Sequence, residues 1–209
     1  MKPSKSQPSR PKPYHHGDLR LAALKAAERI LERDGAQSLT LRAVARAVGV
    51  SHTAPKNHFD DLTGLLSELA AVGYQRFGAS LGSAMEAAGT DPRDRMKAMG
   101  LAYVGFAQAH PGLFQLMFRG ERLDMRRPSL REAIAGAREA LRAAVVARVA
   151  DKPPSPREAA AQGVAMWSLV HGFAMLLLDG RLRNTLSALP GEDAHSLLDL
   201  VLTVTRVGD

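Results

Sequence analysis

The chain has 209 residues, enough to bury a sizeable core, and its 45% hydrophobic content is that of a globular protein. It contains no cysteine, which excludes disulfides and thiolate chemistry, and no apolar stretch follows the first lysines as it would in a signal peptide. The longest apolar run, Phe173 to Leu178, is far too short to span a bilayer. We therefore expect a cytoplasmic protein with no membrane partner.

The net charge of +7 is distributed unevenly along the chain. Residues 1–60 hold 11 Lys/Arg against 5 Asp/Glu, whereas residues 61–209 hold 17 against 16. Nearly all of the excess positive charge therefore lies in the first third of the sequence. This concentration indicates a phosphate-binding surface in that part of the protein.

The first 13 residues are predicted to form a flexible basic arm, because they contain four prolines, four basic residues and no acid. Such an arm can lie along DNA phosphates or in the minor groove, or it can be a solvated tail. A helix is predicted from Asp18, because alanines and leucines recur every three or four residues as far as Leu31. Asp34-Gly35 ends it.

Residues 40–59, TLRAVARAVGVSHTAPKNHF, are predicted to form two short helices joined by a turn. Apolar residues at positions 41, 44, 45 and 48 share one face of the first helix, which Thr40 can cap and Gly49 ends. Ser51 is a good N-cap for the second helix, whose outward side chains would be His52, Thr53, Lys56 and Asn57. A helix-turn-helix places its second helix in the DNA major groove. A helical hairpin without DNA-binding function has the same spacing, but the charge distribution favours DNA binding.

The rest of the chain is also predicted to be helical, which makes the protein all-α. Apolar periodicity and helix-starting residues predict segments at 62–87, from Asp91-Pro92 to His110, at 113–118, and from Pro128 or Ser129 to about Val149. Residues 151–156, DKPPSP, read as a rigid loop. The three glycines of the first segment, Gly73, Gly78 and Gly82, either allow bending or mark close helix packing.

Two broad apolar stripes close the chain. One runs from Val164 to Leu178, and the other comprises Ala194, Leu197, Leu198, Val201 and Val204. Stripes of this width can pair with their copies in a twofold-related subunit, or both can pack inside one monomer.

Several of these motifs, in this order, resemble the tetracycline repressor (TetR) family of transcriptional regulators. YHHGDLR at 14–20, the following helix ending in DGAQSLTLRAVARAVGVS, and APKNHF at 54–59 are similar to the N-terminal domain of that family. HPGLFQLMF at 110–118 and WSLVHG at 167–172 resemble the C-terminal domain of a TetR subgroup with a Trp-x3-His-Gly signature. The resemblance implies a DNA-binding domain at 14–61 and a ligand-binding and dimerisation domain at 62–209.

The resemblance also implies which residues touch DNA. These are Thr40, Arg42, Ser51, His52, Thr53, Lys56, Asn57 and His58. Family members usually carry an aromatic residue, most often Tyr, where this chain has Lys56, and a Lys where it has Leu62. Both usual residues contact DNA phosphates. Lys56 can supply a cation from nearby, so we expect binding to survive with a rearranged phosphate contact.

Ten methionine, aromatic and histidine side chains of the second domain could line a cavity for a small molecule, since such side chains adapt to varied apolar ligands. They are Met96, Met99, Tyr103, Phe106, Phe114, Met117, Met166, Trp167, His171 and Met175. The alternative is that they form ordinary core. No metal or cofactor is expected, because the seven histidines do not cluster along the sequence and no phosphate-cradling glycine loop is present.

We therefore predict a homodimeric regulator, most simply a repressor, that binds a palindromic operator in double-stranded DNA and is released by a small-molecule effector. The alternative from another class is a helical small-molecule-binding protein or enzyme whose basic N-terminus is incidental. The sequence contains no catalytic motif that would support an enzyme.

Overall fold

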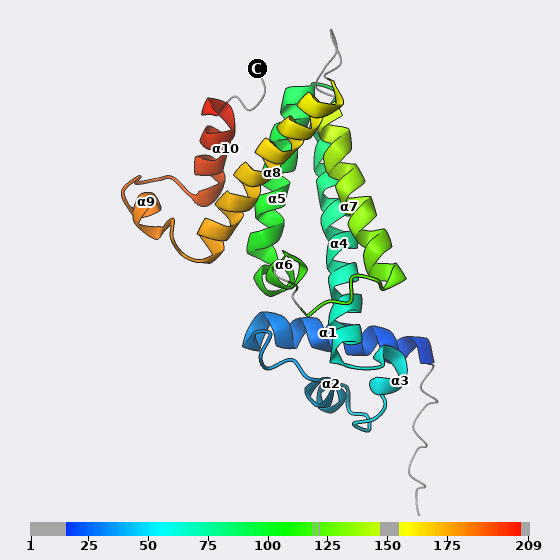
Figure 1. Cartoon of the computed structure of the whole chain (residues 1–209). Coiled ribbons are helices and arrows are strands. Elements are labelled where there is room, and N and C mark those ends of the chain that lie inside the picture. Colours follow the sequence, from blue (N-terminus) through cyan, green and yellow to red (C-terminus); the bar gives the residue numbers. More distant parts are fainter. Residues whose placement is uncertain (1–15, 119, 121, 147–154, 206–209) are drawn as a thin grey trace, which may run out of the picture.

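The computed structural model describes residues 16–118, 120, 122–146 and 155–205, and every regular element within these ranges is helical (Figure 1). The all-α fold class is confirmed. The basic arm and most of the 151–156 loop lie outside the described residues. The helices are α1 (His16–Asp34), α2 (Leu41–Val48), α3 (Lys56–Phe59), α4 (Leu62–Ala87), α5 (Pro92–Ala109), α6 (Pro111–Phe118), α7 (Pro128–Val146), α8 (Pro156–Leu178), α9 (Arg183–Ser187) and α10 (Ala194–Val204).

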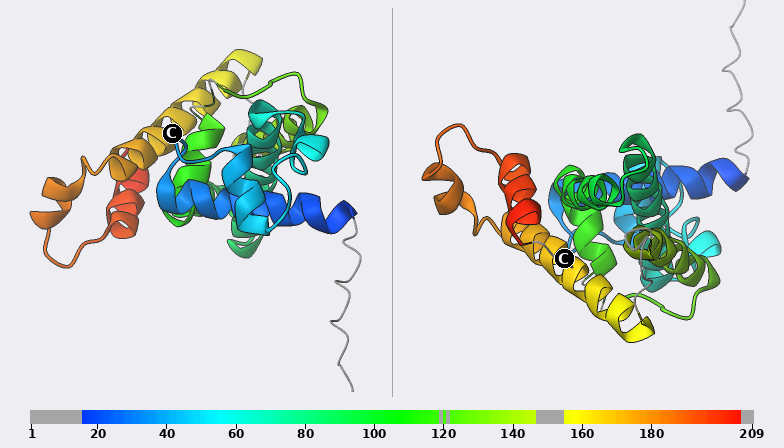
Figure 2. Two further views of the ribbon diagram at one scale, coloured as in Figure 1. Left: turned by 90° about the horizontal axis from the view of Figure 1, so that it is seen from below. Right: turned by 90° about the horizontal axis from the view of Figure 1, so that it is seen from above.

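The helices form a small lower group and a larger upper one. α1 lies across the lower end of α4, with α2 and α3 beneath it, while α4, α5, α7 and α8 rise side by side above (Figure 1). Views from below and above show α8 along the outer side of α5, with α9 and α10 projecting beyond it (Figure 2). The long helix α4 therefore belongs to both groups.

Capping side chains set the ends of the central helices. The carboxylate of Asp61 accepts a hydrogen bond from the N–H of Gly64 at 2.8 Å and starts α4. Asp91 accepts from the N–H of Arg93 at 2.7 Å, and Pro92 occupies the first turn of α5. The sequence predicted that α4 runs from near Leu62 to about Ala87, and the structure agrees. Its start is predictable because the Asp61 cap is a local signal that does not depend on the rest of the fold.

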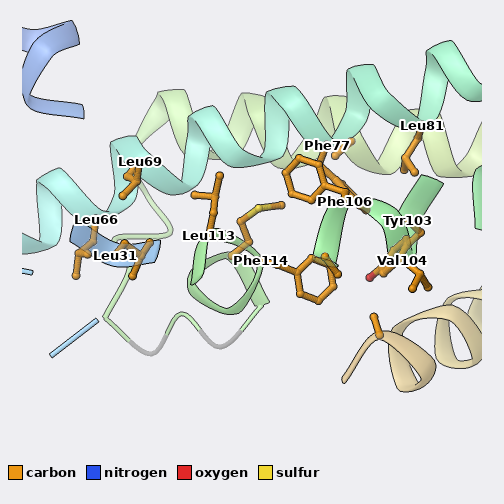
Figure 3. Packing of buried hydrophobic residues seen from close by; sticks show 14 of the residues in the cluster. Leu31, Leu66, Leu69, Phe77, Leu81, Tyr103, Val104, Phe106, Leu113 and Phe114 are labelled. Atoms are coloured by element: carbon orange, nitrogen blue, oxygen red, sulfur yellow. The ribbon is translucent and has the colours of Figure 1, made fainter. Parts of the chain in front are cut away.

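One continuous core joins the two groups. Leu31, Leu66 and Leu69 meet near the crossing of α1 and α4, and the same cluster continues through Phe77 and Tyr103 (Figure 3). Gly73 permits part of this packing, since a Cβ there would lie 2.7 Å from the Sδ of Met117 on α6. Of the two roles considered for the α4 glycines, close packing therefore applies at Gly73.

The apolar stripe predicted on the last helix is only partly buried. Leu198 is 1% exposed and packs within its own subunit, whereas Leu200 and Val204 are 56% and 65% exposed. The α10 helix turns the buried face defined by Ala194 and Leu198 towards α5. A short helix that the sequence did not predict, α9, connects the two stripes.

α8 is the one helix of the described ranges that is long and apolar enough to cross a membrane by length and composition. The length of the longest uninterrupted apolar run did not indicate this property of α8. Ser168 and His171 interrupt the apolar residues, although the mean hydropathy of the segment reaches 1.5. Helices that pack in a protein interior pass the same test. α8 packs against α5 and α7 here, and exposes the apolar side chains of Val164, Trp167 and Leu176.

Candidate DNA-binding surface and ligand-binding core

The helix-turn-helix begins with a capped helix and a sharp turn. The Thr40 hydroxyl accepts a hydrogen bond from the N–H of Ala43 at 3.1 Å, as expected for an N-cap. Gly49 ends α2 at φ 78°, a conformation that glycine adopts without the steric cost of a side chain. Val44 and Ala45 are buried beneath α1. The first helix and its turn are thus formed as predicted.

The second helix differs from the prediction. Ser51 does not cap it: its hydroxyl lies 3.2 Å from that of Thr53, and α3 spans only Lys56–Phe59. Residues 51–55 instead form turns with bonds from N–H to the carbonyl three residues back, such as Ala54 to Ser51 at 3.0 Å. Pro55 explains this, because it has no N–H to donate to the Ser51 carbonyl and its ring would crowd that oxygen in an α-helix.

The predicted DNA-contacting side chains lie on the exposed surface of the lower group. Thr40 and Arg42 are exposed at the start of α2. The turn and the first part of α3 expose Ser51, His52, Thr53, Lys56 and Asn57. His58 is half-buried, with its ring 6.3 Å from that of Phe59. The fold thus brings the start of α2 and the tip of the turn to one end of the molecule (Figure 1), and contact with DNA stays a prediction for each residue.

The predicted pocket residues lie together in the upper group, on α5, α6 and α8. Most are buried in the main core, whereas His171 and Met175 are half-buried and Trp167 is 46% exposed. Two aromatic rings of this cluster were not among the predicted residues. The ring of Phe77 on α4 lies 4.9 Å from that of Tyr103, and the ring of Phe118 lies 4.9 Å from that of His171. Phe77 and Phe118 belong to apolar segments of the sequence, and periodicity alone does not identify the residues that they contact.

Three polar groups are hydrogen-bonded within this aromatic cluster. Trp167 Nε1 donates to the Tyr103 hydroxyl at 3.2 Å, and that hydroxyl lies 3.0 Å from Nδ1 of His171. Burial raises the pKa of Tyr103, an effect that the hydrogen bond from Trp167 partly offsets. Because the phenol keeps its proton, it can donate to Nδ1, which favours the imidazole tautomer with its proton on Nε2. The fully buried Tyr103 thus connects His171 to the half-exposed Trp167.

A second polar contact ties α6 to the lower group. Glu32 on α1 accepts hydrogen bonds from the N–H groups of Gly112 and Leu113, at 2.8 and 2.9 Å. These are first-turn donors of α6 that have no partner within the helix. At the other end of α6, the Tyr74 hydroxyl donates to the carbonyl of Met117 at 2.8 Å. Sequence alone could not assign Glu32 this role, since 80 residues separate it from Gly112.

The comparisons with known proteins agree with this architecture. Residues 96–204 match the family model described as tetracyclin repressor-like, C-terminal domain. A solved protein of unknown function from Rhodococcus sp. RHA1 is 33% identical, and the match covers 93% of this chain and 96% of that one with a TM-score of 0.77. The chain belongs to the tetracycline-repressor-like (TetR) family.

Other solved structures share the fold at lower identity. The TetR family transcriptional regulator PfmR from Thermus thermophilus is 19% identical, with 87% of this chain and 95% of that one covered and a TM-score of 0.60. The multidrug binding protein EbrR, solved with ethidium, is 22% identical, with 92% and 99% covered and a TM-score of 0.61. A search of curated proteins finds no match.

This TetR-family protein is a DNA-binding transcriptional regulator. Regulators of this family are generally not enzymes. The narrower assignment to a subgroup with a Trp-x3-His-Gly signature stays a prediction.

Replacing Glu32 with Gln in this regulator is expected to lower its thermal stability. Glutamine replaces one of the two accepting oxygens with an NH2 group, which donates, and the charge-assisted character of the bonds is lost, at a cost of about 1.5–3 kcal/mol. For a chain of this size the melting temperature should fall by about 3–12 °C. Differential scanning calorimetry measures it.

Glu28→Gln is the matched control on the same helix. Glu28 pairs with Arg76 at 2.6 Å, but the Arg76 side chain is 44% exposed, and such pairs contribute about 1 kcal/mol or less. Equal melting temperatures for the two variants would show that the Glu32 cap does not hold α6 in place.

Proposed function

We propose that this regulator is a homodimeric repressor, located in the cytoplasm and without enzymatic activity, that binds a palindromic operator and leaves it when a small molecule binds the upper helices. The proposal assigns residues 14–61 to DNA binding and 62–209 to dimerisation and ligand binding. The observation that carries it is the position of α6. This helix contacts the aromatic cluster at Phe114 and Phe118, and Glu32 attaches its first turn to α1 of the lower group.

The exposed apolar side chains support the dimer. α8 and α10 expose Val164, Trp167, Leu176, Leu200 and Val204, at fractions between 43% and 65%. Water contact with so many large apolar groups on adjacent helices is unfavourable, and a second copy related by a twofold axis would cover them. A dimer of this kind presents two recognition helices to half-sites about 34 Å apart.

The effector mechanism is a linkage between two binding sites. If the ligand favours an arrangement in which the recognition helices no longer fit successive major grooves, ligand and DNA oppose each other by the same coupling free energy. The structural neighbour EbrR was solved with imidazole and with ethidium. Planar nitrogen heterocycles are therefore the first compounds to test, by quenching of the fluorescence of Trp167, the chain's single tryptophan.

Selection and sequencing of the genomic DNA fragments that the protein retains tests the proposed function directly. A twofold-symmetric sequence enriched by the protein would support the dimeric repressor, and a sedimentation mass of two chains should accompany it. Retention of no sequence above background, or a monomer at micromolar concentration, would contradict the proposal.

Lys56→Ala is expected to weaken binding to all DNA sequences to a similar degree. Lys56 is exposed at the start of α3, where a family aromatic would touch phosphate. Loss of one phosphate contact should lower the slope of log affinity against log salt by about 0.9. Fluorescence anisotropy over a series of salt concentrations measures both quantities.

The control removes the same charge far from the DNA. Arg157 is exposed at the start of α8, at the end of the molecule opposite α2 and α3 (Figure 1). Arg157→Ala should leave the slope unchanged. If Lys56→Ala also leaves slope and affinity unchanged, Lys56 does not contact DNA and the missing aromatic has no replacement.

A further inference from the structure

The recognition helix is joined to α4 through a residue with an unusual backbone. Asp60, which follows α3, has φ 65° and ψ −60°, and is the one non-glycine residue of the described ranges with positive φ. The N–H of Asp61 donates to the carbonyl of Phe59 at 2.7 Å, which closes a γ-turn around Asp60. This form of the turn is rare and strained. The angle between α3 and α4 therefore depends on a strained backbone conformation of Asp60. Other contacts must stabilise this conformation.

Packing against the start of α4 keeps the turn tight. A Cβ at Gly64 would lie 1.9 Å from the carbonyl oxygen of Phe59, so the end of α3 rests directly on the backbone of α4. The buried Phe59 ring anchors the same end in the core. These contacts fix the position of Phe59, but none of them involves the Asp60 side chain.

The Asp60 carboxylate is held from the upper group by Arg127. Nη2 of Arg127 lies 2.8 Å from Oδ2 of Asp60, and Nη1 lies 3.4 Å from Oε1 of Glu68 on α4. The Arg127 side chain is 19% exposed, although Asp60 itself is 84% exposed. Glu68 has two further partners, Arg20 and Ser129, so its position does not depend on Arg127 alone.

The loop that carries Arg127 is itself fixed to α4. The N–H of Asp124 donates to the hydroxyl of Ser67 at 2.8 Å, and Ser67 is the one polar residue of the described ranges that is fully buried. Arg127 in turn donates its N–H to the carbonyl of Asp124 at 3.0 Å. These hydrogen bonds fix the backbone of Arg127 in the upper group. Its guanidinium contacts Asp60, the residue at which the recognition helix ends.

We propose that Arg127 is a positioning residue for DNA binding: by holding the Asp60 carboxylate it keeps the recognition helix in the orientation that fits the major groove. Because Asp60 is 84% exposed, its pair with Arg127 adds little to global stability. The ion pair instead raises the fraction of molecules in which Asp60 has the observed backbone conformation. DNA affinity is proportional to the fraction of molecules in the binding-competent state. Arg127 needs no contact with DNA to act in this way.

The test measures operator affinity, its salt dependence and thermal stability for Arg127→Gln, Asp60→Asn and the double variant, with DNA retained by the wild type as the probe. Each single variant should weaken binding about tenfold, and the double variant no more than either single one, because both remove the same contact. The salt slope should stay at the wild-type value for each variant. The melting temperature should stay at the wild-type value for Asp60→Asn, which leaves the pair between Arg127 and Glu68 in place. Arg127→Lys should recover part of the affinity.

Arg126→Gln is the matched control, since Arg126 is the neighbouring arginine of the same loop and its side chain is 96% exposed. Its affinity should equal that of the wild type. The proposal is overturned if Arg126→Gln weakens binding as much as Arg127→Gln, if the Arg127 variant lowers the salt slope by about 0.9 as a direct phosphate contact would, or if the two single effects multiply in the double variant. A wild-type protein that selects no DNA would instead refute the proposed function.

Discussion

Replacing Leu200 with Glu is expected to convert the proposed dimer into a folded monomer that no longer binds a two-half-site operator at nanomolar concentration. Leu200 is 56% exposed on α10, so a charge there is solvated in the monomer and buried only on association. Twofold symmetry places one unpaired carboxylate per subunit in the interface, and each costs roughly 3 kcal/mol or more. The two carboxylates together cost roughly 6 kcal/mol, so the dimer dissociation constant should rise by at least about ten-thousandfold. Sedimentation velocity measures the association, and anisotropy with the operator measures DNA binding.

Met125→Glu provides the control for adding a charge to an exposed apolar residue. Met125 is 56% exposed in the loop before α7, outside the α8 and α10 surface. This variant should remain a dimer and keep its DNA affinity. A Leu200→Glu protein that still sediments as two chains would show that α10 lies outside the interface.

The choice of Leu200 shows what the sequence could and could not predict about α10. Apolar periodicity correctly predicted a helix there, and an apolar stripe that includes Leu198 and Val201, but it left open whether this stripe pairs with a second copy or packs inside one monomer. Leu198 is 1% exposed in its own subunit, so a charge at that position would unfold the monomer. A pattern of apolar residues marks faces that avoid water, and it cannot separate burial within a subunit from burial between subunits.

Helix ends were predicted where a local side chain determines them. Asp61 and Asp91 cap α4 and α5 through their own backbone neighbours, and those starts are confirmed. The recognition helix was harder, since Ser51 has the chemistry of an N-cap but Pro55 prevents the α-helical bond that a cap at Ser51 would require. The preference of Ser51 for an N-cap position and the missing N–H of Pro55 make opposite predictions there, and the effect of the proline decides where α3 begins.

The functional contacts that the sequence missed are those between distant segments. Glu32 is one of several acids on α1 and Arg127 one of several arginines in a charged loop, and nothing beside them in the chain identifies their partners. The residues predicted to line a pocket could be selected as a group because aromatic and methionine side chains are rare enough to stand out. Which of these side chains would bond to one another was not predictable beyond the spacing of Trp167 and His171 on one helix face.

These contacts place α6 between the aromatic cluster proposed to bind the ligand and the helices of the lower group. Phe114 and Phe118 lie 5.7 and 4.9 Å from His171 by ring centroids. Glu32 and Tyr74 hold the two ends of the same helix. Because hydrogen bonds tie both ends of the eight-residue helix α6, a displacement of the whole helix must either move α1 and α4 or break one of these bonds.

The hydrogen-bonded cluster of Tyr103, Trp167 and His171 should therefore control the effector response more than DNA binding itself. Trp167→Phe and His171→Ala are each expected to leave operator affinity within about tenfold, roughly 1.4 kcal/mol. The effector concentration needed for release should change by more than tenfold, because Trp167 reaches both the exposed α8 face and the buried Tyr103. Titration of the protein–operator complex with a compound found by Trp167 quenching measures the shift.

Tyr103→Phe separates signalling from simple core packing. The ring can keep its edge-on contact with Phe77 at 4.9 Å, while the indole N–H and Nδ1 of His171 both lose their partner. The free energy of unfolding should fall by about 1–3 kcal/mol, and the effector response should shift as it does for His171→Ala. Tyr74→Phe, which removes the hydroxyl bonded to Met117, calibrates the stability cost of losing one buried hydroxyl. If the Tyr103, Trp167 and His171 variants lose stability and DNA binding together, while the folded fraction responds to effector as the wild type does, these three residues hold the core and do not transmit the signal.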